Sequence, residues 1–190
     1  PTRVSGAPAR DDPSGRRVSL TDTSGATIFP TDSYAETGGI AEKHVFANGV
    51  AVATIRNMGA NANTFWNLTD HLNSTRFVTN TTGGVVERAN YEPFGSIVPS
   101  GYSLVASGSA ERRKYTGHEF DAGTGFTYAK ARYLDTNAGR FVSQDPKFIN
   151  NPEQLLEDPQ QMNSYAYARN NPIVYIDPTG EAVYAMAKGL

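Results

Sequence analysis

The segment YTGHEFDAGTGFTYAKARYLDTNAGRFVSQDP, residues 115–146, decides the fold class. Gly125 ends a short polar run, and glycine supplies the positive φ that tight hairpin turns require. After this turn, Phe126 and Tyr128 flank the polar Thr127. Such alternation with a period of two is typical of a strand that has one exposed face. The segment therefore predicts short antiparallel strands joined by tight turns.

The same plan occurs three times along the chain, in TDTSGATIFPTDSYAE, TNTTGGVVERANYEPFG and DAGTGFTYAKARYLD. Each copy has a turn led by Asp or Asn and closed by Gly, then an extended run, then a Tyr followed closely by an acidic residue. The equivalent residues are Gly25, Gly83 and Gly125 for the turn, Tyr34, Tyr91 and Tyr133 for the tyrosine, and Glu36, Glu92 and Asp135 for the acid. An internal repeat of this kind indicates an architecture built from repeated hairpins.

Other turn signals extend this pattern to a meander of hairpins. Asn48-Gly49 is a typical hairpin turn, and the segment MGANAN, residues 58–63, is expected to form another hairpin tip. Helix is scarce: short helices are predicted only near the C-terminus, in PEQLLED, in QMNSYAYAR and in the tail EAVYAMAKGL. The predicted fold class is mostly β, an antiparallel hairpin strip with short helices near the C-terminus.

Composition excludes several classes of function. The 190 residues include no cysteine, so disulfides, thiolate chemistry and cysteine-based zinc sites are excluded. The net charge is −2 and the basic residues are scattered, so nucleic acid is not an expected partner. No apolar run approaches the roughly 18 residues of a membrane span. Because the chain starts at Pro1, we expect a fragment or a processed piece of a longer protein.

Three long stretches, LTDHLNSTRFVTNTTGGVVERANYEPFG, residues 115–146 and NSYAYARNNPIVYIDPTG, resemble the C-terminal core of Rhs, or YD-repeat, proteins. DDPSGRRVSLTD and FANG are similar to the repeats that precede this core, so the resemblance covers nearly the whole chain. It implies a YD-repeat hairpin strip over residues 1–112, an RHS repeat-associated core over residues 113–181 and a tail over residues 182–190.

The resemblance also implies a function. In Rhs toxins and in the C component of Tc toxins, such strips form a β-shell that encloses a C-terminal toxin, and teneurins have a similar extracellular shell. The expected partners are upstream YD repeats or further copies of this chain, together with a C-terminal toxin cargo. The expected location is secreted or at the cell surface, and no cofactor or metal is expected.

In the polymorphic toxins the core resembles an aspartyl autoprotease that cuts just after a DPxGL motif. Carried over to this chain, the resemblance gives Asp145 and Asp158 as the carboxylate pair, and Asp177, Pro178, Gly180 and Glu181 as the cleavage region. Two like charges held close together have separated pKa values, which leaves one acid and one base. Two departures, Gln144 in place of the usual Arg and Glu181 in place of Leu, favour an uncleaved chain.

Structural explanations compete with these roles. Asp before Pro commonly starts turns, and His71 and His118 are expected to be hydrogen-bonded structural residues, because three scattered histidines do not suggest a ligand set. Asn67, Asn73 and Asn80 begin glycosylation sequons, which arise by chance in Thr-rich strips. Two alternatives to a shell wall remain open, a self-assembling tube or fibre formed by strand addition between copies, and a glycan-binding surface.

Overall fold

The structure is a computed structural model. It describes residues 9–13, 15–22, 25–98, 104–105, 111–147, 153, 160 and 162–186. Within these residues the chain forms three antiparallel sheets of ten, four and two strands, in which every strand pairs with the next one along the chain. The predicted hairpin meander is therefore confirmed. No helix in the described part of the chain is long and apolar enough to cross a membrane.

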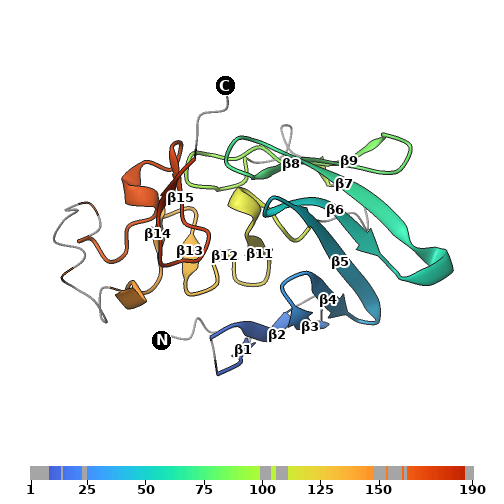
Figure 1. The fold of residues 1–190 in the computed structure, drawn as a ribbon, viewed down its shortest axis with the longest axis horizontal. Helices are drawn as coiled ribbons and strands as arrows, with labels where there is room; N and C mark the ends of the chain where they lie inside the picture. The colour runs from blue at the N-terminus through green and yellow to red at the C-terminus, as the bar shows by residue number, and fades with distance from the viewer. Residues whose placement is uncertain are drawn as a thin grey trace.

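The ten-stranded sheet contains the whole N-terminal half of the described chain. Its strands are β1 (Arg10–Asp11), β2 (Arg17–Asp22), β3 (Gly25–Thr31), β4 (Tyr34–Thr37), β5 (Ile40–Ala47), β6 (Val50–Arg56), β7 (Asn63–Thr69), β8 (Thr75–Thr79), β9 (Val85–Arg88) and β10 (Leu104–Val105). The sheet curls, so that β1 to β4 lie below and β7 to β9 above the later strand β11 in the view of Figure 1. Such curvature follows from the natural twist of long meanders.

The predicted turn glycines lie at chain reversals. Gly25, Gly83 and Gly125 all have positive φ, and they lie at the β2–β3, β8–β9 and β11–β12 turns. Asn48 and Gly49 lie between β5 and β6 and have φ values of 50° and 78°. A type I′ hairpin turn requires such positive φ at both of its central residues. The short 3-10 helix η1 (Gly59–Asn61) forms the predicted tip between β6 and β7.

The four-stranded sheet is formed by the segment that decided the fold class. Its strands are β11 (Glu119–Asp121), β12 (Phe126–Tyr128), β13 (Tyr133–Asp135) and β14 (Arg140–Phe141). Leu134 pairs with both Thr127 and Phe141 and is fully buried. Around this sheet lies the main apolar core, which contains Leu72, Tyr115, Ala129, Leu134, Phe141, Tyr167, Ala168 and Ile176.

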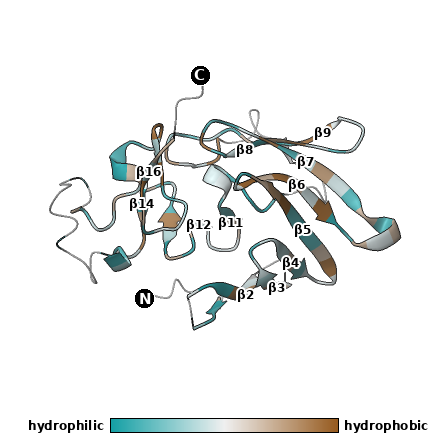
Figure 2. Ribbon diagram, viewed as in Figure 1, coloured by the Kyte–Doolittle hydropathy of each residue, from teal (hydrophilic) through white to brown (hydrophobic). Residues whose placement is uncertain are grey.

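The two faces of the curled sheet carry opposite chemistry. From β5 to β9 the inner face is largely polar and buried, with His44, Thr54, Asn67 and Glu87 covered by residues 111–121, whereas β2 to β4 carry a small buried apolar cluster of Leu20, Phe29 and Ala35. Its outer face exposes large apolar side chains, and Figure 2 shows hydrophobic residues recurring along β5, β6 and β7. These side chains are Val45 (37% exposed), Trp66 (51%), Leu68 (49%) and Phe77 (38%). The ten-stranded sheet, which we also call the wall, is therefore held on its inner side by ion pairs and hydrogen bonds between side chains.

The C-terminal part is less helical than predicted. The 3-10 helix η4 (Ala168–Asn170) follows a stretch that forms turns and a bridge to Arg140, where positive φ at Ala168 and Arg169 prevents an α-helix. The predicted tail helix is wrong where the structure describes the tail, because β16 (Tyr184–Ala185) pairs with β15 (Tyr175–Ile176). An isolated helix of this length is marginal, whereas strand pairing satisfies the same backbone groups. The predicted helix at residues 152–158 lies mainly outside the described residues.

Candidate functional site

A buried arginine organises the part of the core that contains the predicted site residues. Arg132 follows the tight turn between β12 and β13, and its side chain is 2% exposed. One terminal nitrogen, Nη2, lies 2.8 Å from the Asp145 carboxylate and 3.1 Å from the Asp177 carboxylate. The guanidinium also lies 3.6 Å from the centre of the Phe141 ring. We call Arg132, Asp145 and Asp177 the Arg132 centre.

The remaining donors of Arg132 bind backbone carbonyls of the C-terminal segment. Nη1 donates to the Ser164 carbonyl at 3.1 Å, and Nε donates to the Gly180 carbonyl. Arginine suits this position because its planar group presents five donors in a fixed geometry. The guanidinium therefore joins β13, the SQDP turn and the DPTG segment in one network.

The DPTG segment is held in place by its own aspartate. Asp177 is fully buried, and its Oδ1 accepts hydrogen bonds from the backbone N–H of Thr179 at 3.4 Å and of Ala182 at 3.0 Å. Gly180 has φ +74°, and a Cβ there would lie 2.4 Å from the Ala129 carbonyl oxygen. Only glycine fits this close approach without strain. The turn role expected for the last Asp-Pro pair is thus what the local geometry shows.

The two carboxylates of the Arg132 centre differ in how far they are buried. Burial raises the pKa of Asp177 against the opposing effect of Arg132, and burial lowers the pKa of Arg132. Asp145, by contrast, is 18% exposed and can be solvated. One guanidinium thus serves two carboxylates, and burial favours the protonated form of Asp177.

His118 supports the same segment from the other side. Its Nε2 donates to the backbone carbonyl of Asp177 at 2.9 Å. Burial lowers the pKa of His118 to about 4, with the Asp177 carbonyl opposing and Arg113 and Lys130 adding to the decrease. The ring is therefore neutral at pH 7 and acts as a hydrogen-bond donor, the structural role expected from the sequence.

The depressed pKa of His118 predicts a loss of stability in acid. The ordinary value of 6.5 applies to the unfolded chain and about 4 to the folded chain, so the unfolded state binds more protons in between. The stabilisation is complete above pH 6.5 and decreases by about 3 kcal/mol as the pH falls towards 4. Urea unfolding between pH 7.5 and 4.5 should show a smaller decrease for His118→Gln than for the natural chain. His71→Gln, at an exposed position, should behave as the natural chain does; equal slopes for the natural chain and His118→Gln would contradict the prediction.

A large cleft adjoins the Arg132 centre. It has a volume of about 1460 Å³ and lies between the first strands of the curled sheet and the four-stranded sheet. Its lining includes Arg132, Pro178, Thr179 and Glu181, and also Phe29 of β3. The predicted cleavage region thus borders the cleft with Pro178 and Glu181, whereas Asp177 and Gly180 are buried behind it.

The structure brings together only part of the predicted site. Asp145 meets Asp177 through Arg132, while Asp158, the predicted second carboxylate, lies outside the described residues. The sequence prediction missed Arg132, although it stands in the quoted motif KARYLD. An arginine directly before an aromatic strand residue, Tyr133, was a weak signal for a buried cation. Spacing along the chain could not show that two aspartates share it.

Comparison with known proteins identifies the class. The family model described as Teneurin YD-shell matches residues 48–173, more than half of the chain. The chain therefore belongs to the YD-shell family, as its resemblance to YD-repeat proteins predicted.

Two curated relatives and one solved structure show the range of this class. The chain is 31% identical over 107 residues to the tRNA nuclease WapA of Bacillus subtilis (strain 168), covering 56% of this chain and 4% of that protein. It is 38% identical over 120 residues to salivary gland surface protein 1 of Aedes aegypti, covering 63% and 3%. It superposes on a chain of the Photorhabdus luminescens Tc holotoxin pore with a TM-score of 0.70 and 19% identity, covering 100% of this chain and 10% of that one. The chain thus spans only a small part of each relative, and the Tc toxin likeness shows the fold.

Proposed function

We propose that this chain forms part of a β-shell that encloses or caps a C-terminal toxin in a secreted polymorphic-toxin system. The proposal rests on the curled ten-stranded sheet, whose inner face is covered by residues 111–121 of the same chain (Figure 1). The family match and the likeness to a Tc toxin chain support the same role. The partners are then neighbouring YD repeats and the toxin, and the location is secreted or at the cell surface.

Limited proteolysis tests the shell. In the full polypeptide that carries this chain, the segment after residue 190 should resist protease until denaturant unfolds the wall. The same segment produced alone serves as the control and should be digested at once. Equal digestion rates for the enclosed and the isolated segment would overturn the proposal.

The second candidate function is a single self-cleavage, and the Arg132 centre favours it. The resemblance places the cut after Glu181, and the nitrogen of that bond belongs to Ala182, which donates to Asp177 Oδ1. Asp145, beside Arg132, would take a proton from water as the oxygen attacks the Glu181 carbonyl carbon. The bond to Ala182 nitrogen then breaks, and Asp177, in those chains in which it is protonated, supplies the proton that the leaving amine requires. In this proposal Asp177 takes the role first given to Asp158.

Mass spectrometry of the native chain tests self-cleavage. The natural chain should release a fragment that begins at Ala182, and Asp145→Asn and Asp177→Asn should each abolish the release. Asp135→Asn, where the carboxylate accepts from the N–H groups of Asn137 and Ala138 in the turn after β13 and takes no part in the Arg132 ion pairs, is the matched control and should cleave normally. An intact natural chain after prolonged incubation, or cleavage that continues in Asp145→Asn, would remove this candidate while leaving the shell proposal standing.

A further inference from the structure

A buried lysine and a buried glutamate meet on the inner face of the wall, apart from the Arg132 centre. Lys114 Nζ is in direct contact with Glu87 Oε1, and the two side chains are 10% and 1% exposed. Glu87 lies on β9, whereas Lys114 belongs to the segment 111–121 that covers the wall. An ion pair at this depth gives up the hydration of both charges, so it adds little net stability. An amine and a carboxyl group thus meet where little water reaches them.

The two oxygens of the Glu87 carboxyl group have different neighbours. Oε1 faces the lysine, while Oε2 accepts a hydrogen bond from the backbone N–H of Glu111 at 2.7 Å. A backbone donor fixed in this way stabilises negative charge that develops on the oxygen it contacts, as the donors of an oxyanion hole do. The site therefore presents a nucleophile on one oxygen of the carboxyl group and a charge-stabilising donor on the other.

Backbone hydrogen bonds hold both partners of this pair in place. The Lys114 N–H donates to the His118 carbonyl at 2.8 Å, and the Lys114 carbonyl accepts from the Thr75 N–H at 3.1 Å. Glu87 is paired with Val78 of β8 on one side and with β10 on the other. The contact between the two side chains is therefore set by the sheet and by the segment that covers it.

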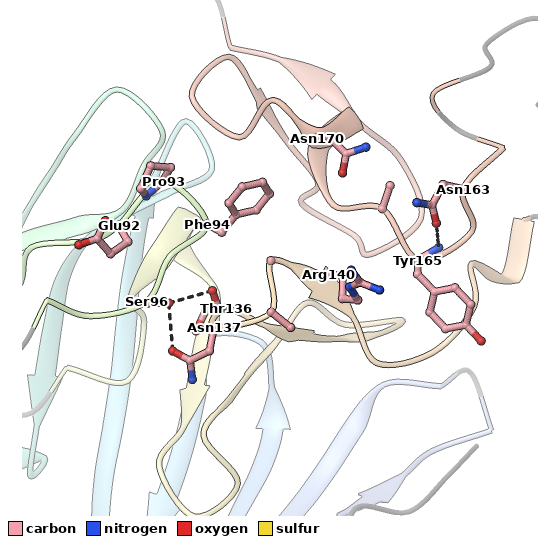
Figure 3. A pocket seen from close by; sticks show the side chains of 13 residues that line it. Glu92, Pro93, Phe94, Ser96, Thr136, Asn137, Arg140, Asn163, Tyr165 and Asn170 are labelled. Atoms are coloured by element: carbon pink, nitrogen blue, oxygen red, sulfur yellow. Dashed lines mark hydrogen bonds between the residues drawn. The ribbon is translucent and has the colours of Figure 1, made fainter.

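The residue after the lysine is anchored as well. The Tyr115 hydroxyl donates to the Pro93 carbonyl at 2.7 Å, in the turn that the chain makes after β9. Figure 3 shows how this turn is tied to the four-stranded sheet, where Ser96 Oγ donates to the Thr136 carbonyl at 2.8 Å. Reacting groups held in contact by a rigid frame gain effective molarities of about 10⁵–10⁸ M in the best cases. The frame around Lys114 is of this kind.

Burial also favours the uncharged forms of both groups. Burial and the nearby Arg56 lower the pKa of Lys114 to about 8. Transfer of one proton from the ammonium to the Glu87 carboxylate removes two charges from a site that hydrates them poorly. The neutral amine of a desolvated lysine is a nucleophile, whereas an ammonium group is not. A fraction of the chains therefore holds an amine beside a carboxylic acid.

We propose that Lys114 and Glu87 condense to an amide, which joins the wall to the segment that covers it by a covalent bond between side chains. Lys114 Nζ attacks Cδ of protonated Glu87, and the Glu111 N–H stabilises the negative charge that develops on Oε2. One amine proton passes to Oε1, the bond between Cδ and Oε1 breaks, and water leaves as the carbonyl at Oε2 forms again. Nothing is oxidised or reduced, and no other reactant is consumed. The inference is independent of the proposed shell function and of self-cleavage.

Mass spectrometry of the purified, acid-unfolded chain tests the bond. The chain should be lighter than its sequence mass by the mass of one water molecule. After digestion with trypsin, residues 77–88 should remain joined to residues 114–130 through Glu87 and Lys114, because trypsin does not cleave after an acylated lysine. The linear peptide of residues 115–130 should decrease in the same proportion. A full sequence mass, together with the linear peptide in full yield, would overturn the proposal and leave an ordinary ion pair.

Two conservative variants separate an amide bond from an ion pair. Lys114→Arg keeps a cation beside Glu87 but has no amine that forms an amide, so this variant should have its full sequence mass. Lys130→Arg changes an exposed lysine whose Nζ lies 3.9 Å from Asp32, and this variant should still lose one water. Circular dichroism confirms that both variants are folded. Loss of one water from Lys114→Arg would place the reaction elsewhere in the chain and would also overturn the proposal.

Discussion

Arg132→Met is expected to lower the free energy of unfolding by about 3–5 kcal/mol, the cost of leaving a buried charge without its partner. Methionine keeps much of the side-chain volume, so the main change is the loss of the cation between Asp145 and Asp177. Asp177 is fully buried and would keep only backbone donors. Chemical unfolding at pH 7, followed by circular dichroism, measures the loss.

Two further variants show whether the charge is the cause. Arg140→Met, eight positions later on β14, removes an exposed arginine and should change stability by less than about 0.5 kcal/mol. Adding Asp177→Asn to Arg132→Met removes the uncompensated carboxylate, so the double variant should be more stable than additivity predicts. A loss below about 1 kcal/mol in Arg132→Met, or strict additivity, would show that water solvates these carboxylates.

The sequence predicted those features that depend on neighbouring residues. Asn48-Gly49 and Gly125 determine turns because their backbone requirements are local, and the alternation around Thr127 determines a strand for the same reason. The tail was predicted incorrectly because its helix-forming composition is outweighed by pairing of Tyr184–Ala185 with a strand that begins at Tyr175. Strand pairing of this kind depends on tertiary contacts that composition does not contain.

The candidate site depended on contacts between distant residues. Arg132 and Asp177 are 45 positions apart, and the sequence contained no signal that a second aspartate would be Asp177. The resemblance to Rhs cores supplied Asp145 and the DPTG segment, which the structure places around one guanidinium. The sequence also did not reveal which face of the curled sheet is buried. Alternation gives two faces, and only the position of residues 111–121 makes the polar face the inner one.

This inverted arrangement predicts that a buried acid matters more than an exposed apolar side chain. Glu111 accepts from Thr54 Oγ1 at 2.5 Å, from Asn67 Nδ2 at 3.3 Å and from the Arg113 N–H at 3.0 Å. His44 Nδ1 lies 3.6 Å away. Burial alone would raise the pKa of Glu111, but His44, Arg113 and Thr54 together lower it below its ordinary 4.5, so the carboxylate is ionised in the folded wall.

Glu111→Gln should therefore lower the free energy of unfolding by about 3 kcal/mol at pH 7, because the negative charge and one of the two acceptor oxygens are lost from a buried site. Leu68→Thr on the outer face, where the leucine is 49% exposed, should cost less than about 1 kcal/mol. Because the pKa of Glu111 is lower in the folded chain, its contribution is present above pH 4.5 and decreases as the pH falls further. The difference between Glu111→Gln and the natural chain should accordingly decrease in acid. Urea unfolding at pH 7 and at pH 4 measures both effects, and a larger loss from Leu68→Thr than from Glu111→Gln would mean that the apolar outer face holds the wall together.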